Sequence, residues 1–175
     1  VRRFRDRTRS PSVIFSVGAL LVLYRIGERL FNRDVGLVSA LIAAVAVFQI
    51  QAAQNTRLYS LLAVLRLLSM YFFLGLRESR TSAWAGYLAS TIALLYTHHY
   101  GLLIVIAQNA YVVGVAVASR ERAASLRRWF TLQLLLVLLY APWLAVLPRQ
   151  VANTEAYAWI VRPTLSTLMH NVRAY

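Results

Sequence analysis

The chain has 175 residues, 59% of them hydrophobic, with nineteen arginines, no lysine, six acidic residues and no cysteine. The formal charge of +13 would suit a nucleic-acid-binding protein, but the arginines fall in short links between apolar runs, so we expect no nucleic-acid partner. The absence of cysteine excludes disulfides and thiolate metal sites. Apolar blocks separated by basic links predict an all-α fold, a polytopic transmembrane helical bundle.

The apolar runs follow one another along almost the whole chain. Pro11 suits the first turn of the first helix, where its missing N–H is not needed, and Pro142 is expected to break the last helix near its end. The tail beyond residue 158 is mixed in polarity and is expected to lie in the interface. We predict membrane helices over residues 12–31, 35–51, 58–76, 83–97, 101–118 and 129–147.

A polar turn precedes the run 58–76 and carries amide and guanidinium side chains. Arginine offers a planar fork of donors that suits phosphate oxygens, and asparagine and glutamine offer the mixed donors and acceptors that sugars require. We therefore predict a substrate site at the mouth of this helix, made by Gln54, Asn55, Arg57 and Tyr59. The alternative is that these residues only cap the helix at the headgroups.

Arg66 lies inside the same apolar run. It is nine residues beyond Arg57, which at about 1.5 Å per residue places it roughly 13 Å further along the axis, close to mid-bilayer. A charge there is costly, and no other apolar run offers a carboxylate to pair with it. Arg66 shares a helix face with Tyr59, seven residues before it. We predict that Arg66 binds substrate; the alternative is a structural arginine that snorkels or bonds to carbonyls of a neighbouring helix.

The run 83–97 ends in two histidines and a tyrosine, His98, His99 and Tyr100. Adjacent histidines on a helix point about 100° apart, so the pair is a poor two-ligand metal site. His98 can ligate a metal with a partner elsewhere or donate to a phosphate, and the alternative is an interfacial histidine satisfied by water or a carbonyl. The sequence contains no HExxH, CxxC, GxGxxG or Walker motif. It therefore lacks the motifs typical of metalloproteases, redox proteins and nucleotide-driven proteins.

The tail adds Trp159 and Arg162, an aromatic and a cation that can grip a ligand. An interfacial anchor is the alternative for both. The links 25–34, 77–82 and 119–128 hold nine arginines, against three in 49–57, 98–100 and 148–162. Since arginine-rich links favour the cytoplasm, the polar turn, the histidine pair and the Trp159 loop are expected together on the outer face. The five arginines before residue 10 run against this orientation.

The chain resembles the integral-membrane GT-C glycosyltransferases, in particular the bacterial and archaeal relatives of protein mannosyltransferases, glycosyltransferase family 39. The resemblance covers five segments in this order: LVLYRIGERLFNRDVGLVSALIAAV, QAAQNTRLYSLLAVLRLLSMYFFL, YTHHYGLLIVIAQNAY, LYAPWLAVLPRQ and AWIVRPTL. It implies an enzyme of the prokaryotic plasma membrane. Such an enzyme transfers a sugar from a polyprenyl-phosphate carrier to an extracytoplasmic acceptor, which is a lipid, a glycan or a protein.

The resemblance also implies roles for particular residues. The family pattern Q-E-A-R-x-Y falls on residues 54–59 and would turn Arg57 toward the carrier phosphate and Tyr59 toward the groove. The pattern T-H-Y-Y falls on residues 97–100, with His98 as the functional position. Asn55 stands where the family usually has Glu, which puts a divalent metal cofactor in doubt.

In this family the acidic catalytic base lies in the first outer loop, and nothing before Ser12 resembles that loop. We therefore expect residues 1–175 to be one transmembrane domain that is incomplete at both ends, with the base outside it. Inverting transfer needs that base, together with cations to steady the departing phosphate, and Arg57, Arg149 and Arg162 are candidates. The rival interpretations are a transporter or flippase of a lipid-linked sugar and a non-catalytic membrane scaffold.

Overall fold

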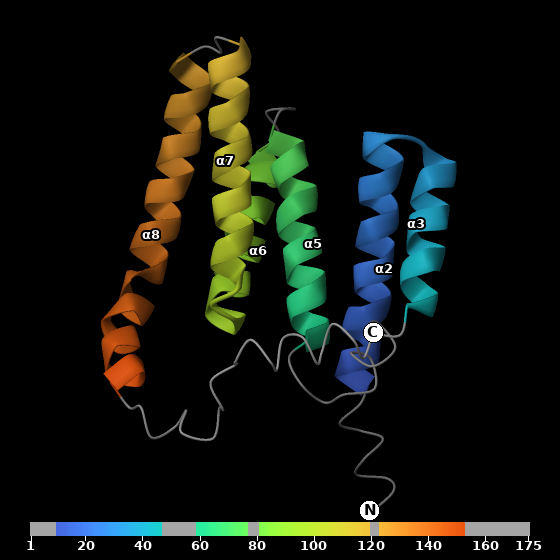
Figure 1. The fold of residues 1–175 in the computed structure, drawn as a ribbon, viewed down its shortest axis with the longest axis horizontal. Helices are drawn as coiled ribbons and strands as arrows, with labels where there is room; N and C mark the ends of the chain where they lie inside the picture. The colour runs from blue at the N-terminus through green and yellow to red at the C-terminus, as the bar shows by residue number, and fades with distance from the viewer. Residues whose placement is uncertain (1–9, 47–58, 77–80, 120–122, 153–175) are drawn as a thin grey trace, which may run out of the picture. The chain divides into compact units, whose positions relative to one another are not determined.

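The computed structural model describes residues 10–46, 59–76, 81–119 and 123–152, and in this part of the chain every regular element is a helix (Figure 1). The all-α prediction is confirmed. The helices are α2 (Ser10–Leu30), α3 (Arg33–Val45), α5 (Tyr59–Gly75), α6 (Thr81–Thr97), α7 (Gly101–Ser119) and α8 (Ala123–Ala152).

Most of the predicted helix ends lie within a few residues of the observed ones. The exceptions are α3, which stops at Val45 before an extended residue at Ala46, and α8, which begins six residues before the predicted Trp129. The start of α3 is set locally, because the Asn32 side chain accepts a hydrogen bond from the Val35 N–H at 2.9 Å.

The predicted break at Pro142 is wrong, since α8 continues through this residue to Ala152. A proline deprives the carbonyl four residues before it, that of Leu138, of its helical donor. Membrane helices tolerate this where neighbours supply donors. The next carbonyl, that of Leu139, accepts a hydrogen bond from the Tyr96 hydroxyl at 2.9 Å. The chain divides into two compact units between Tyr140 and Ala141, and all contacts described below lie in the first.

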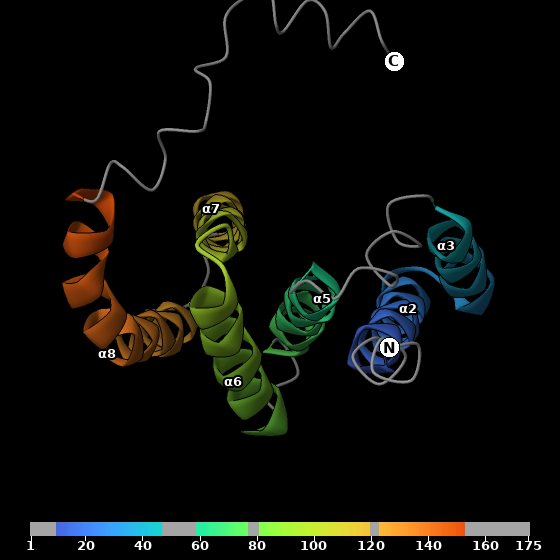
Figure 2. The same cartoon turned by 90° about the horizontal axis from the view of Figure 1, so that it is seen from below.

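Contacts between helices show that α2, α5 and α7 run in one direction and α3, α6 and α8 in the other. The pairs that establish this are Gly27 with Gly36, Ala19 with Ala63, Arg29 with Tyr71, Ser69 with Thr91, Leu94 with Gly101, Tyr87 with Trp129 and Tyr96 with Leu139. In both views α5 lies between α2 and α6 (Figures 1 and 2). The helix ends therefore alternate as the sequence predicts.

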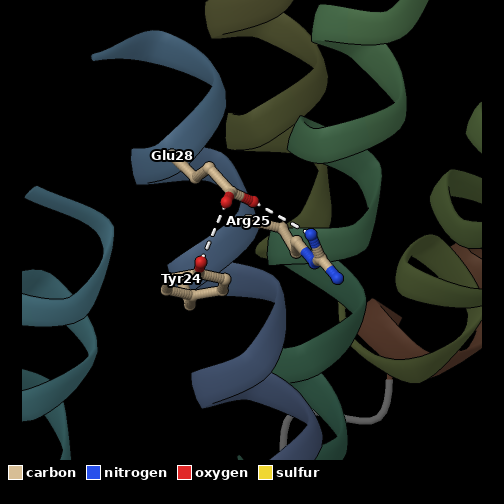
Figure 3. A network of polar contacts seen from close by, with 3 residues as sticks. All are labelled: Tyr24, Arg25 and Glu28. Carbon is tan, nitrogen blue, oxygen red and sulfur yellow. Dashed lines mark hydrogen bonds and ion pairs between the residues drawn. The ribbon is translucent and has the colours of Figure 1, made fainter. Parts of the chain in front are cut away.

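The turn between α2 and α3 gathers charged side chains at the end of this hairpin. Glu28 accepts hydrogen bonds from the Tyr24 hydroxyl at 2.8 Å and from the Arg25 guanidinium at 3.0 Å (Figure 3). The second of these contacts is the one ion pair within the part of the chain that the structure describes. Arg29 instead reaches α5, where its Nη1 lies 3.5 Å from the Tyr71 carbonyl oxygen and its guanidinium lies over the Tyr71 ring.

A buried polar network joins α5 and α6 to α7. Gln108 is 3% exposed, and its amide donates to Ser69 Oγ at 3.1 Å and accepts from the Tyr87 hydroxyl at 3.0 Å. Ser69 in turn shares a hydrogen bond of 2.9 Å with Thr91. Buried polar groups are costly unless paired, and these four side chains pair with one another.

The same network extends to α8. The Gln133 amide lies 3.4 Å from the Tyr87 hydroxyl and accepts from Asn109 at 3.1 Å, while the Trp129 indole donates to Asn109 at 3.0 Å. Around it, Phe73, Tyr87 and Trp129 pack with ring centroids 5.6 to 6.2 Å apart. Four helices therefore share one polar and aromatic core.

Among the described residues, two helices are long and apolar enough to cross a membrane, over Gly101–Ala118 and Leu126–Val146. Only 11% of the first stretch and 22% of the second are buried within the protein. A core helix of a soluble domain would be mostly buried, so these exposed apolar surfaces indicate contact with lipid.

We predict that Gly27→Ala loosens the α2–α3 hairpin. A Cβ at Gly27 would lie 2.8 Å from Gly36 Cα, so the two backbones must separate, and overpacking of this kind costs about 1 to 3 kcal/mol. Gly114→Ala is the matched control, because a Cβ there meets nothing within 4 Å and alanine has the better helix propensity. Thermal unfolding of the full chain in detergent should show a lower Tm for Gly27→Ala alone; equal Tm values would contradict the close contact.

Candidate functional site

Five of the ten predicted substrate-binding residues are described by the structure: Tyr59, Arg66, His98, His99 and Tyr100. The other five, Gln54, Asn55, Arg57, Trp159 and Arg162, lie outside the described residues, as does the Arg149 side chain. Tyr59 begins α5 and His98 follows the last residue of α6. Since these two helices are antiparallel, both residues lie at the same end of the pair.

His98, His99 and Tyr100 form the turn between α6 and α7, and not the last turn of a helix as the sequence analysis assumed. The turn is closed by the Gly101 N–H, which donates to the His98 carbonyl at 2.9 Å. Gly101 is required here, because a Cβ would lie 2.9 Å from Leu94 Cγ. We define these three residues, His98 to Tyr100, as the histidine turn.

The three rings of the histidine turn pack against one another. The centroids of His98 and His99 lie 4.3 Å apart at an interplanar angle of 35°, and both are within 5 Å of the Tyr100 ring, at 4.7 and 4.9 Å. The expected divergence of about 100° between the histidines is therefore wrong, because the residues leave the helix before their side chains spread. Tyr100 is 63% exposed, so the cluster presents an aromatic face outward.

Hydrogen bonding fixes the tautomer of His98. Its Nδ1 accepts from the Tyr100 N–H at 3.1 Å, so in the neutral ring the proton is on Nε2, which is left to donate. Partial burial, followed by the charge of the adjacent His99, lowers the pKa of His98 below its ordinary value of 6.5. At neutral pH His98 is consequently an uncharged donor through Nε2.

The described residues contain no group of three or more histidine and acidic side chains close enough to hold a metal. The packed rings of His98 and His99 do not direct their nitrogens toward one tetrahedral metal ion. A metal at His98 would need its other ligands from the segments outside the described residues.

Tyr59, Arg66 and Met70 form an exposed strip along α5, which we call the α5 strip. Their spacing of seven and then four residues keeps them on one helix face. On one side Ala63 and Val64 pack against α2, and on the other Ser69 and Phe73 pack in the core. The predicted shared face of Tyr59 and Arg66 is confirmed.

Within the described residues Arg66 has no hydrogen-bond partner and no ion pair. An arginine at the centre of a membrane helix costs about 2.5 to 3.5 kcal/mol on insertion scales. The alternative in which Arg66 bonds to carbonyls of a neighbouring helix finds no support in the described part of the chain.

The buried polar network was not predicted from the sequence, although its members are all polar residues inside apolar runs: Ser69, Tyr87, Thr91, Gln108, Asn109, Trp129 and Gln133. Their positions inside predominantly apolar runs were the available signal. The network is satisfied internally, so we assign it to structure and not to substrate binding.

Residues 5–146 match the family model of dolichyl-phosphate-mannose-protein mannosyltransferases. No curated protein and no solved structure matches the chain.

We predict that His98 titrates below 6.5, because burial and His99 both disfavour its protonated form. Since the folded-state pKa of His98 is lowered, the neutral ring in this environment contributes stability that is present above the ordinary value of 6.5 and is lost as pH falls through the folded-state pKa. Histidine-selective NMR of the detergent-solubilised chain should show an Nε2-protonated ring, and His99→Gln should raise the His98 pKa. An Nδ1-protonated ring, or a pKa unchanged by His99→Gln, would refute this geometry.

Proposed function

Because the chain belongs to the dolichyl-phosphate-mannose-protein mannosyltransferase family, we propose that this membrane glycosyltransferase takes its sugar from a polyprenyl-phosphate carrier and transfers it to an extracytoplasmic acceptor lipid, glycan or protein. The observation that carries the proposal is the histidine turn, which offers a neutral Nε2 donor and an exposed aromatic face at the end of α6 where α5 begins. Both features suit a sugar phosphate.

In this proposal the donor phosphate is held from two sides. Arg57 precedes α5 by two residues and supplies charge, and His98 supplies a directed hydrogen bond to a phosphate oxygen. The departing carrier phosphate gains negative charge in the transition state, so fixed donors at that point lower the barrier. Tyr59 is 45% exposed at the start of α5 and is available to the same ligand.

We propose that the polar and aromatic residues near this phosphate bind the sugar. Gln54 and Asn55 provide amide donors and acceptors, and His99 and Tyr100 provide ring faces. For Trp159 and Arg162 we propose an aromatic and a cationic contact to the ligand. Asn55 lacks the charge with which a glutamate would hold a divalent metal, so we assign no metal to this position. No residue of this chain is assigned as the base that deprotonates the acceptor hydroxyl.

We propose that the site faces the extracytoplasmic side of a multi-pass protein of the prokaryotic plasma membrane. The support is the arginine bias of the links at the opposite helix ends together with the alternating helix directions. Residues 1–175 act in this proposal as part of one transmembrane domain.

We expect Arg57→Ala to abolish transfer by the full-length protein. Losing one fixed donor to a developing oxyanion typically costs about 10²- to 10³-fold in rate. The assay follows release of polyprenyl phosphate and labelled product from polyprenyl-phosphate-linked mannose in proteoliposomes. Arg33→Ala is the matched control, since Arg33 is exposed at the opposite helix end. Movement of the intact lipid-linked sugar across the bilayer without cleavage would favour a transporter, and normal turnover of Arg57→Ala would refute its role.

Reporter fusions at Asn55 and at Glu121 should report opposite sides of the membrane. The alternating helix directions require this if the helices span the bilayer, and an outside signal at Asn55 supports the proposed face. The same side for both fusions would overturn the topology, and an inside signal at Asn55 would overturn the orientation.

A further inference from the structure

The α5 strip is the one described surface on which a cation lies within an apolar helix away from both of its ends. Arg66 is seven residues from the start of α5 at Tyr59 and nine from its end at Gly75, or about 10 and 13 Å along the axis. The other described arginines lie in α2, α3 and α8 within a few residues of the links that join the helices. Arg66 therefore differs from them in position.

The part of the chain that the structure describes offers little to compensate the charge of Arg66. The described acids are Glu28 and Asp34, and both lie at the α2–α3 turn, where Glu28 already accepts from Tyr24 and Arg25. The direction of α5 puts that turn at the far end from Tyr59, because Arg29 contacts Tyr71 near the end of α5. Within the described residues the charge of Arg66 is thus unmatched.

The surroundings of Arg66 define the ligand. A soluble anion would have to leave water to reach an apolar helix face, whereas the phosphate of a lipid approaches with its tail already in the bilayer. Helical side chains lean toward the N-terminal end of their helix, which directs Arg66 toward the rim at Tyr59. Met70 continues the strip on the other side, and methionine adapts readily to an apolar chain.

We infer that the α5 strip is a lipid-phosphate subsite, in which Arg66 binds the phosphate of the isoprenoid carrier while Met70 contacts its tail and Tyr59 lies at the rim. This inference rests on the proposed function, since it takes the carrier of the sugar donor as the ligand. It adds a specificity determinant: Arg66 selects a phosphate-bearing isoprenoid and delivers it to the histidine turn. Arg66 acts on capture of the donor and not on the chemical step.

The test is binding of polyprenyl phosphate to the full-length protein in phosphatidylcholine nanodiscs, with neutral polyprenol as the matched ligand. Arg66→Gln should weaken polyprenyl phosphate binding about tenfold or more, as expected for loss of a charged hydrogen bond, and leave polyprenol binding unchanged. Arg66→Lys, which keeps the charge and loses the planar fork, should fall between. Arg33→Gln removes the same charge at an exposed position away from the strip and should bind as wild type.

Equal affinities of wild type and Arg66→Gln for polyprenyl phosphate would overturn the inference. Displacement of the isoprenoid phosphate from wild type by phosphatidylglycerol would do so as well, because the site would then be a general anionic-lipid site. If Arg66→Gln does not fold, the comparison of wild type with Arg66→Lys decides, and identical binding overturns it.

Kinetics separate this inference from the proposed function. In the transfer assay Arg66→Gln should raise KM for the lipid-linked donor and leave kcat near that of wild type. Transfer with an unchanged KM refutes the subsite and leaves the function standing. Binding that depends on Arg66 in a protein without transferase activity refutes the function and leaves the subsite standing.

Discussion

The fold depends on one constraint, which is that polar side chains inside an apolar bundle must find one another. Ser69, Thr91, Gln108 and Tyr87 satisfy each other across three helices, and Gln133 and Asn109 carry the network to the fourth. In lipid or in an apolar core no water replaces a missing partner. A shift of one helix by a single residue would turn these groups away from their partners, so the network selects one register among α5, α6, α7 and α8. Van der Waals packing alone would tolerate several.

That register also sets the position of the helix ends that flank the histidine turn. Thr91 is six residues before Thr97, the last residue of α6, so fixing Thr91 against Ser69 on α5 also fixes the start of the histidine turn. Tyr96 adds a second tie, because its hydroxyl bonds to Leu139 on α8 and its ring packs on Tyr140 at 5.7 Å. The turn itself then needs little further support, since Gly101 and the Tyr100 N–H to His98 contact close it locally. Rigid helices thereby hold a short turn whose side chains are free to meet a ligand.

The sequence predicted the helices well because each is a separate apolar run bounded by charged or glycine-containing links, and such a signal is local. It failed at Pro142, through which α8 continues, and at the histidine pair, where the residues lie beyond the helix end and the Tyr100 N–H bonds to His98 Nδ1. The sequence also did not predict the network. Its hydrogen-bonded partners are 20 to 46 residues apart in the chain, so their pairing cannot be predicted until it is known which sides of the helices face one another. Tyr59 and Arg66 were correctly placed on one face, because seven residues make two turns of any α-helix.

The contrast within α5 explains why Arg66 is assigned to a ligand and Ser69 to the fold. Ser69 is fully buried and bonded to both Thr91 and Gln108, so its polarity is matched within the protein. Arg66 is three residues earlier, exposed, and without a partner in the described chain. Helix α5 thus gives the Ser69 hydroxyl two hydrogen-bond partners, but within the described residues it leaves the Arg66 guanidinium without one. These two side chains are under different constraints. The first constraint is met on folding, and we propose that the second is met when Arg66 binds an anion, which under the proposed function is the phosphate of the lipid carrier.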